Sequence, residues 1–212
     1  MINIHYFTFN GFQENTFILS DETKKCVIID PGCYSNEEQQ ELTNFISEND
    51  LIPTKLLNTH CHIDHVLGNN FVASKYNIGL EMHEKDLPTL LATPEYGHTF
   101  GFNMDPSPEP TNLLKEGDVV KFGNSELEVI FTPGHSPGHI VFVNHQQKFV
   151  INGDVLFQGS IGRTDLPGGD YITLIDNIKS KLLILSDDFI VYTGHGSSTT
   201  IGYERNHNPF LK

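Results

Sequence analysis

The chain has 212 residues, 38% of them hydrophobic and 19% charged, with a net charge of −14. This composition is typical of a folded globular protein of ordinary domain size, and it excludes disordered and fibrous classes. The 13 basic residues are scattered along a chain with 27 acidic ones. No nucleic-acid partner is therefore expected, because contact with a phosphate backbone needs clustered lysine and arginine.

No targeting or membrane segment is visible in the sequence. The N-terminus lacks a basic stretch ahead of an apolar run, and Cys26, Cys33 and Cys61 form no regularly spaced pairs. We expect a reducing compartment and a cytoplasmic location. The longest apolar runs, such as 182–185, are too short to span a bilayer, so no membrane partner is expected. No linker divides the chain, which predicts a single domain over residues 1–212.

Short runs rich in β-branched and aromatic residues predict strands at six places. In chain order, they cover Thr16–Leu19, Cys26–Ile29, Lys55–Asn58, Glu126–Phe131, Phe149–Ile151 and Phe189–Tyr192. Helical patterns fall between these runs, so the sequence predicts an α/β fold.

Two helices and one loop are predicted between the strands. Ser35 followed by Glu38 predicts a capping box that opens a helix through Leu42, Phe45 and Ile46. A second amphipathic helix is indicated by apolar residues at helical spacing, namely Ile172, Ile175, Ile178, Leu182 and Leu185. Between Leu91 and Leu113 the chain is rich in proline, which predicts an irregular loop of the kind that forms lids or binding sites.

Histidine or aspartate follows four of the predicted strands, each time after a turn of glycine, proline or threonine. These residues are His60, His62, Asp64 and His65 after the third run, then His135, Asp154 and His195 after the last three. Because open α/β sheets place their sites beyond strand ends, we expect these side chains to converge.

Imidazole and carboxylate are the ligands that hold zinc and similar ions while leaving a position for water. The alternation of His60 and His62 lets two imidazoles reach one ion, and the adjacent pair Asp64 and His65 can turn to a second. A lone carboxylate such as Asp154 can bridge both. The pattern therefore predicts a two-metal site, which lowers the pKa of a shared water to about 7.

The segment from Thr59 to His65 resembles the T-H-x-H-x-D-H motif of the metallo-β-lactamase superfamily, and His135, Asp154 and His195 match its later ligands. The resemblance covers nearly the whole chain. It implies an αββα sandwich of two mixed sheets flanked by helices, with the site at the seam between the sheets. It further implies that one ion is held by His60, His62 and His135, the other by Asp64, His65 and His195, and both by Asp154.

Within the superfamily, the segment 132–139 is similar to the third-ligand motif of the glyoxalase II-like hydrolases. The segments 153–157 and 162–170 and the ending 194–210 resemble the compact bacterial branch of that group. This resemblance implies hydrolysis of an acylthiol of the hydroxyacylglutathione type by a hydroxide that bridges two divalent ions, with Asp64 holding the hydroxide in line. Zinc is the expected metal, with iron and manganese as alternatives. Longer glyoxalase II enzymes carry basic residues that hold glutathione in a C-terminal segment, whereas only 196–212 follow the last ligand here.

Two other activities on the same fold remain open. A persulfide dioxygenase uses one iron, held by residues matching His60, His135 and Asp154, a set suited to Fe(II) and O₂. A lactonase is the other alternative. The 166–170 continuation favours the thioester hydrolase.

Three further residues have a predicted role. Arg163 lies nine residues after Asp154 and is either a clamp for a substrate carboxylate or a structural partner of Asp165 or Asp170. His139 either contacts the substrate or supports a metal ligand from behind, and the supporting role is the expected one. Cys61 lies between two ligands, so we expect its side chain to point away from the site and to pack in the core.

Overall fold

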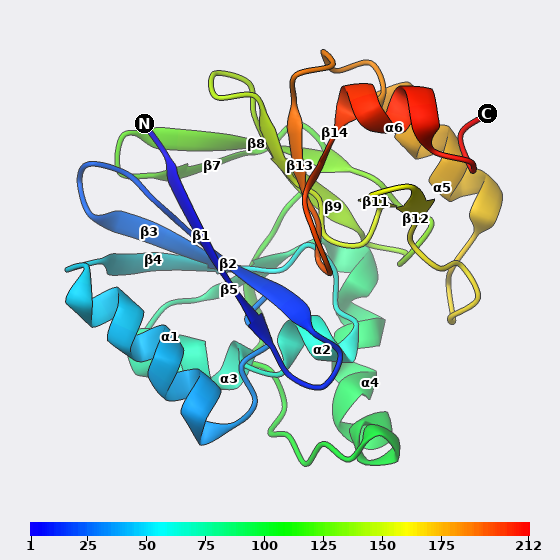
Figure 1. Cartoon of the computed structure of the whole chain (residues 1–212). Helices are drawn as coiled ribbons and strands as arrows, with labels where there is room; N and C mark the ends of the chain where they lie inside the picture. The colour runs from blue at the N-terminus through cyan, green and yellow to red at the C-terminus, as the bar shows by residue number, and fades with distance from the viewer.

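Two six-stranded sheets lie face to face in the computed structural model, which describes residues 1–212 (Figure 1). The first sheet has the order β1 (Asn3–Phe9), β2 (Glu14–Ser20), β3 (Lys25–Ile29), β4 (Ile52–Leu57), β5 (Leu80–Met82) and β6 (Pro110–Leu113). The second has the order β14 (Thr199–Thr200), β13 (Ile190–Tyr192), β10 (Phe149–Ile151), β9 (Ile140–Asn144), β8 (Ser125–Phe131) and β7 (Val119–Phe122). Both sheets mix parallel and antiparallel pairs.

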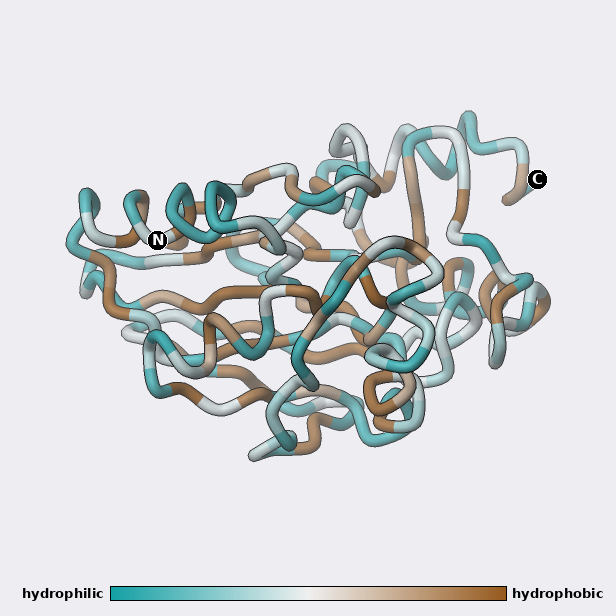
Figure 2. The backbone as a smooth tube through the Cα atoms, turned by 90° about the horizontal axis from the view of Figure 1, so that it is seen from below, coloured by the Kyte–Doolittle hydropathy of each residue, from teal (hydrophilic) through white to brown (hydrophobic).

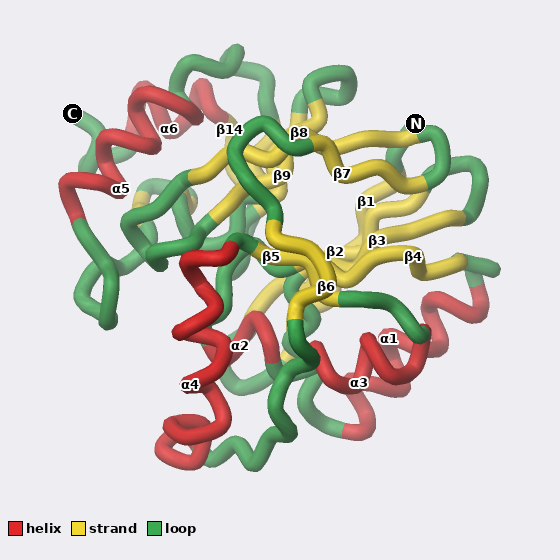
Figure 3. Tube along the Cα trace, turned by 180° about the vertical axis from the view of Figure 1, so that it is seen from behind, coloured by secondary structure: helices red, strands yellow, loops and turns green.

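Helices cover the outer face of each sheet (Figure 3). The first sheet carries α1 (Asn36–Glu48), α2 (Ile63–Val66), α3 (Asn69–Tyr76), η1 (Glu84–Asp86), α4 (Leu87–Gly97) and η2 (His98–Phe100). The second carries α5 (Tyr171–Asn177), η3 (Ile178–Leu182) and α6 (Ile201–His207), with β11 (Leu156–Phe157) and β12 (Ser160–Ile161) as a separate pair. The predicted αββα sandwich is confirmed. None of these helices combines the length and the apolar character needed to cross a membrane.

Strand alternation divides the buried side chains between three cores. Val27 and Ile29 of β3 join the core between the sheets, whereas Cys26 and Ile28 face the core beneath α1. Because successive side chains of a strand point to opposite faces, one strand supplies two layers. Strand β9 does the same between the central core and the core beneath α5. Figure 2 shows the resulting hydrophobic colouring along the inner strands.

The predicted capping box is present at the start of α1. The backbone N–H of Glu38 donates to the hydroxyl of Ser35 at 3.2 Å, and the Glu38 carboxylate accepts from the Ser35 N–H at 2.9 Å. Leu42 and Ile46 are buried beneath the first sheet, as their spacing predicts.

The second predicted helix forms, but its buried face differs from the prediction. Leu174, Ile178 and Leu182 pack against the second sheet, whereas Ile172 is 71% exposed. The helix changes from α5 to the π-helical η3 at Ile178 and ends at Leu182, so Leu185 lies beyond it. Ile172 precedes Leu174 by two residues, about 200° around an α-helix, and therefore points away from the buried face.

The prediction of one irregular loop from Leu91 to Leu113 is wrong at both ends. Helix α4 continues to Gly97, and β6 begins at Pro110. Pro94 lies within α4 and cannot donate to the Leu90 carbonyl, but the Thr93 hydroxyl donates to that oxygen at 2.7 Å. Only residues 101–109 lack regular structure.

Candidate metal centre

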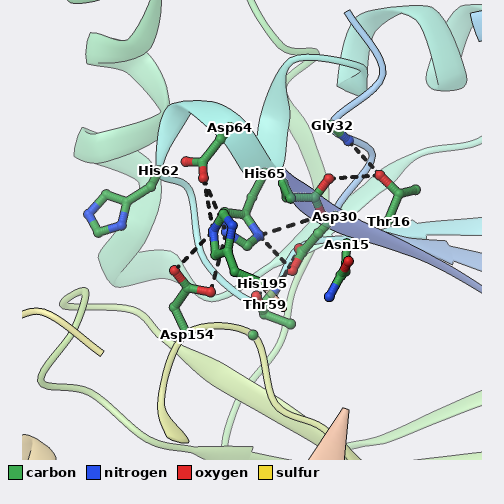
Figure 4. Close-up of polar contacts among 12 residues, drawn as sticks. Asn15, Thr16, Asp30, Gly32, Thr59, His62, Asp64, His65, Asp154 and His195 are labelled. Atoms are coloured by element: carbon green, nitrogen blue, oxygen red, sulfur yellow. Dashed lines mark hydrogen bonds and ion pairs between the residues drawn. The ribbon is translucent and has the colours of Figure 1, made fainter. Parts of the chain in front are cut away.

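The seven predicted ligands follow the C-terminal ends of four strands, as expected. They come after β4 in the first sheet and after β8, β10 and β13 in the second. Strands β10 and β13 are parallel neighbours, so Asp154 and His195 leave the second sheet at the same edge. The β4 segment approaches them from the first sheet, and the side chains meet at the seam between the two sheets (Figure 4).

These side chains form two sets of three. The ligand atoms of each set lie within 4.8 Å of one another, the first set being His60, His62 and His135 and the second Asp64, His65 and His195. Asp154 lies between the sets. Its carboxylate oxygens are 3.6 Å from His135 Nε2, 3.5 Å from His65 Nε2 and 3.4 Å from His195 Nε2. The structure therefore brings all seven predicted residues together in one cluster.

Buried polar atoms without partners show that the cluster fits cations. His60 Nε2, His65 Nε2 and Asp154 Oδ1 are buried and make no hydrogen bond. Leaving such atoms unpaired is costly unless something else satisfies them. All three are donor atoms of the kind that borderline divalent metals prefer, so a bound ion accounts for them.

The charges in the cluster also favour a cation. Burial lowers the pKa of His62 to about 3, helped by His135, and leaves its imidazole neutral, which is the form that binds metal. At His195 burial acts in the same direction, but hydrogen bonds that its ring donates to the carboxylates of Asp154 and Asp64 outweigh burial and raise the pKa to about 10. The two carboxylates thus attract positive charge to this point, and a bound metal ion would displace the proton.

Asp30 orients His65 from behind. Its carboxylate accepts from His65 Nδ1 at 3.2 Å, so that Nε2 faces the cluster. It also accepts from the backbone N–H of Thr59 at 2.7 Å and from the Thr59 hydroxyl at 2.5 Å. A carboxylate that holds the far nitrogen of a ligand histidine fixes its tautomer and ring orientation. Asp30 follows the buried strand β3 just as the predicted ligands follow theirs, and this position is the signal from which its role could have been found.

His139 and Cys61 lie where the sequence suggested. His139 is fully buried, and its Nε2 accepts a hydrogen bond from the backbone N–H of Asp154 at 3.1 Å. Cys61 packs in the core against Met82, away from the cluster. Its backbone N–H donates to Asp86 at 2.7 Å, and Asp86 also accepts from the loop that carries His135.

The turn between β1 and β2, residues 10–13, contacts two members of the second ligand set, Asp64 and His195. The His195 Nδ1–H points to the carbonyl oxygens of Phe12 and Gln13 at 3.1 and 3.2 Å. Asn10 Nδ2 donates to the carbonyl of Asp64 at 3.1 Å. Just after the turn, Asn15 Nδ2 donates to the Thr193 carbonyl at 3.0 Å. Sequence reasoning missed these contacts, because they join segments far apart in the chain.

A cavity of about 610 Å³ opens over the cluster and gives a substrate access to it. Arg163 lines this cavity, and its guanidinium donates to both carboxylate oxygens of Asp165 at 2.7 and 2.8 Å. Asp170 instead caps α5 by accepting from Thr173. Arg163 is thus placed for substrate contact and paired with Asp165 at the same time.

Comparison with known proteins agrees with this fold and site. Residues 9–195 match the model of the metallo-beta-lactamase superfamily, and the chain belongs to that superfamily. It is 43% identical to hydroxyacylglutathione hydrolase GloC of Haemophilus influenzae (strain ATCC 51907 / DSM 11121 / KW20 / Rd), over 99% of this chain and 98% of that protein. The chain is therefore a metallohydrolase of the glyoxalase II-like branch.

Two solved structures share the whole fold. The BLEG-1 B3 metallo-beta-lactamase superposes with a TM-score of 0.90 at 34% identity, covering 99% of this chain and 100% of that one. TTHA1623, solved in a di-iron-bound form, gives a TM-score of 0.88 at 35% identity, covering 98% and 100%.

Proposed function

We propose that the protein hydrolyses thioesters of the hydroxyacylglutathione type with two divalent metal ions, zinc being the expected one. His60, His62 and His135 would hold one ion, and Asp64, His65 and His195 the other. The observation that carries the proposal is the position of Asp154, whose carboxylate lies between the two sets and would bind both ions. The likeness to the GloC hydrolase supports the choice of substrate class.

Two divalent ions bound here would lower the pKa of a water molecule to about 7 and polarise a substrate carbonyl. Asp64 would hold the attacking water in line with the acyl carbon, because its carboxylate lines the cavity. The oxygen of that water bonds to the acyl carbon, the carbon–sulfur bond breaks, and the thiol takes the proton. The sulfur leaves without a general acid, since a thiol has a pKa of about 8.5.

Anaerobic assay of S-lactoylglutathione tests the proposed reaction. Metal-loaded protein is expected to release free thiol without oxygen, at a rate that rises with pH towards neutrality as the attacking water ionises. Oxygen electrode traces with glutathione persulfide and hydrolysis of simple lactones serve as parallel assays. Oxygen uptake on the persulfide with no thioester cleavage would replace the hydrolase by a dioxygenase, and lactone cleavage alone would replace it by a lactonase.

Arg163 is proposed to anchor a carboxylate of the thiol carrier. Such a contact is made in both the ground state and the transition state, so its loss should act mainly on KM. Arg163→Ala is expected to raise KM for glutathione thioesters about tenfold to a hundredfold, as for a charge-assisted hydrogen bond of ~1.5–3 kcal/mol. A thioester without that carboxylate is expected to be almost unaffected.

Asp165→Ala provides the matched control for Arg163. Hydrogen bonding from Arg163 lowers the pKa of Asp165 to about 2, so this carboxylate stays ionised at higher pH and competes with a substrate carboxylate. Removing it should lower KM if Arg163 is an anchor. If Arg163→Ala raised KM equally for the thioesters with and without the carboxylate, and also lowered the melting temperature, Arg163 would be only structural.

A further inference from the structure

The cavity over the cluster has two unlike walls. One wall, on the side of His135, carries the charged side chain of Arg163. It also contains Ser160, Phe157 and Leu166. The His135 Nδ1–H donates to the Arg163 carbonyl at 2.7 Å. The other wall, on the side of Asp64 and His195, contains Phe12, Tyr96 and Phe100, together with Ile63 of α2. We call the three rings the aromatic wall.

The aromatic wall is assembled from separate segments. Phe12 comes from the β1–β2 turn, Tyr96 from α4 and Phe100 from η2. The rings of Phe12 and Phe100 lie edge to face at 5.6 Å, and those of Tyr96 and Phe100 at 6.2 Å, which are favourable geometries for aromatic pairs. Even so, Phe12 is 41% exposed and Phe100 is 54% exposed. Apolar surface of this size beside a reaction centre gains free energy when a ligand covers it.

The aromatic wall offers no charge to an anionic group. Burial, together with the nearby carboxylate of Asp64, raises the pKa of Tyr96 to about 12, so its phenol stays neutral. Arg163 is the one lysine or arginine in the cavity lining, and it belongs to the opposite wall. A peptide carboxylate would therefore lose its hydration against the aromatic wall and gain no partner there.

We propose that the aromatic wall is the acyl subsite and selects thioesters whose acyl group carries an apolar, preferably aromatic, substituent. This inference rests on the proposed thioester hydrolysis. The thiol half and the acyl half of a thioester extend in opposite directions from the reacting carbon. With the carboxylate of the thiol carrier at Arg163, the acyl substituent points to Phe12, Tyr96 and Phe100.

A matched pair of substrates tests the proposal. S-mandeloylglutathione and S-lactoylglutathione are both 2-hydroxyacyl thioesters and differ in a phenyl against a methyl group. The wild type is expected to favour the phenyl substrate in kcat/KM by about tenfold to a hundredfold, the range expected for burial of an added apolar group. Phe100→Ala is expected to bring the ratio of the two kcat/KM values towards one. Phe210→Ala, which removes a ring that is 42% exposed and outside the cavity, should leave the ratio unchanged.

Binding of unreactive thioether analogues separates the acyl subsite from the reaction. Calorimetry would compare S-(2-oxo-2-phenylethyl)glutathione with S-(2-oxopropyl)glutathione on the wild type and on Phe100→Ala. Tighter binding of the phenyl analogue to the wild type, with the difference lost in Phe100→Ala, would support the aromatic wall as the acyl subsite. If neither thioester were cleaved in that case, the proposed reaction would be overturned but the subsite would not. Equal kcat/KM for the two thioesters and equal affinity for the two analogues would overturn the acyl subsite and leave the reaction class intact.

Discussion

Asp154→Ala is expected to abolish binding of both proposed metal ions and, with them, hydrolysis. The Asp154 carboxylate lies within 3.6 Å of histidines from both ligand sets. Zinc-saturated protein should fall from about two ions per chain to fewer than about one, measured by elemental analysis after gel filtration. The loss in kcat/KM should be at least about a thousandfold, the scale seen when one group that stabilises a transition state is removed.

Asp176→Ala on the exposed face of α5 is the matched control for this loss. It removes a carboxylate outside the cluster and should keep both ions and full activity. An Asp154→Ala protein that retains two ions would show that this carboxylate does not bridge. A wild type that saturates at one ion would instead contradict the two-metal site itself.

Gly194→Ala is expected to weaken metal binding while leaving the fold intact. A Cβ at this position would lie 2.2 Å from Asp154 Oδ1 and 2.8 Å from His65 Cε1. The side chains that must move are both proposed ligands, so the strain falls on the site. We expect a fall in metal affinity of about tenfold to a hundredfold, as for other disturbances of ligand orientation. Competition with a chromophoric chelator would measure it.

Gly11→Ala in the β1–β2 turn is the control, because a Cβ there meets nothing within 4 Å. It should bind metal like the wild type. Circular dichroism melting of both variants would show whether a loss at Gly194 reflects the site or the whole fold. Unchanged metal affinity in Gly194→Ala would mean that the Asp154 carboxylate can shift without loss of the ions.

Much of the fold could be predicted because the central strands are apolar and end in turns. The runs at Glu126–Phe131 and Phe149–Ile151 agree with β8 and β10 almost to the residue. Strand β1 was missed, although five of its seven residues, Ile4, Tyr6, Phe7, Thr8 and Phe9, are of the β-branched and aromatic types that mark the predicted runs. Helix α4 was hidden by Pro94, since its compensating bond from Thr93 is visible only in three dimensions.

The composition of the proposed site could be predicted, but its supports could not. The metal ligands could be predicted because residues that lie close together in the sequence need a fixed spacing to reach one ion, and that spacing is visible as a motif. Asp30 acts across strands on His65, and the carbonyls of Phe12 and Gln13 hold His195 from the other end of the chain. Such partners depend on strand order and sheet packing, which leave no local pattern in the sequence.

The contact between the β1–β2 turn and His195 can form only late in the synthesis of the chain on the ribosome. Gln13 and His195 are 182 positions apart, and strand β13 must dock before their contact can form. Domains fold as units once their segments have been synthesised. A nascent chain therefore contains Asp64 and His65 long before His195, the third residue of their set, has been synthesised. The proposed second ion could therefore bind only after β13 has docked, late in the synthesis of the chain.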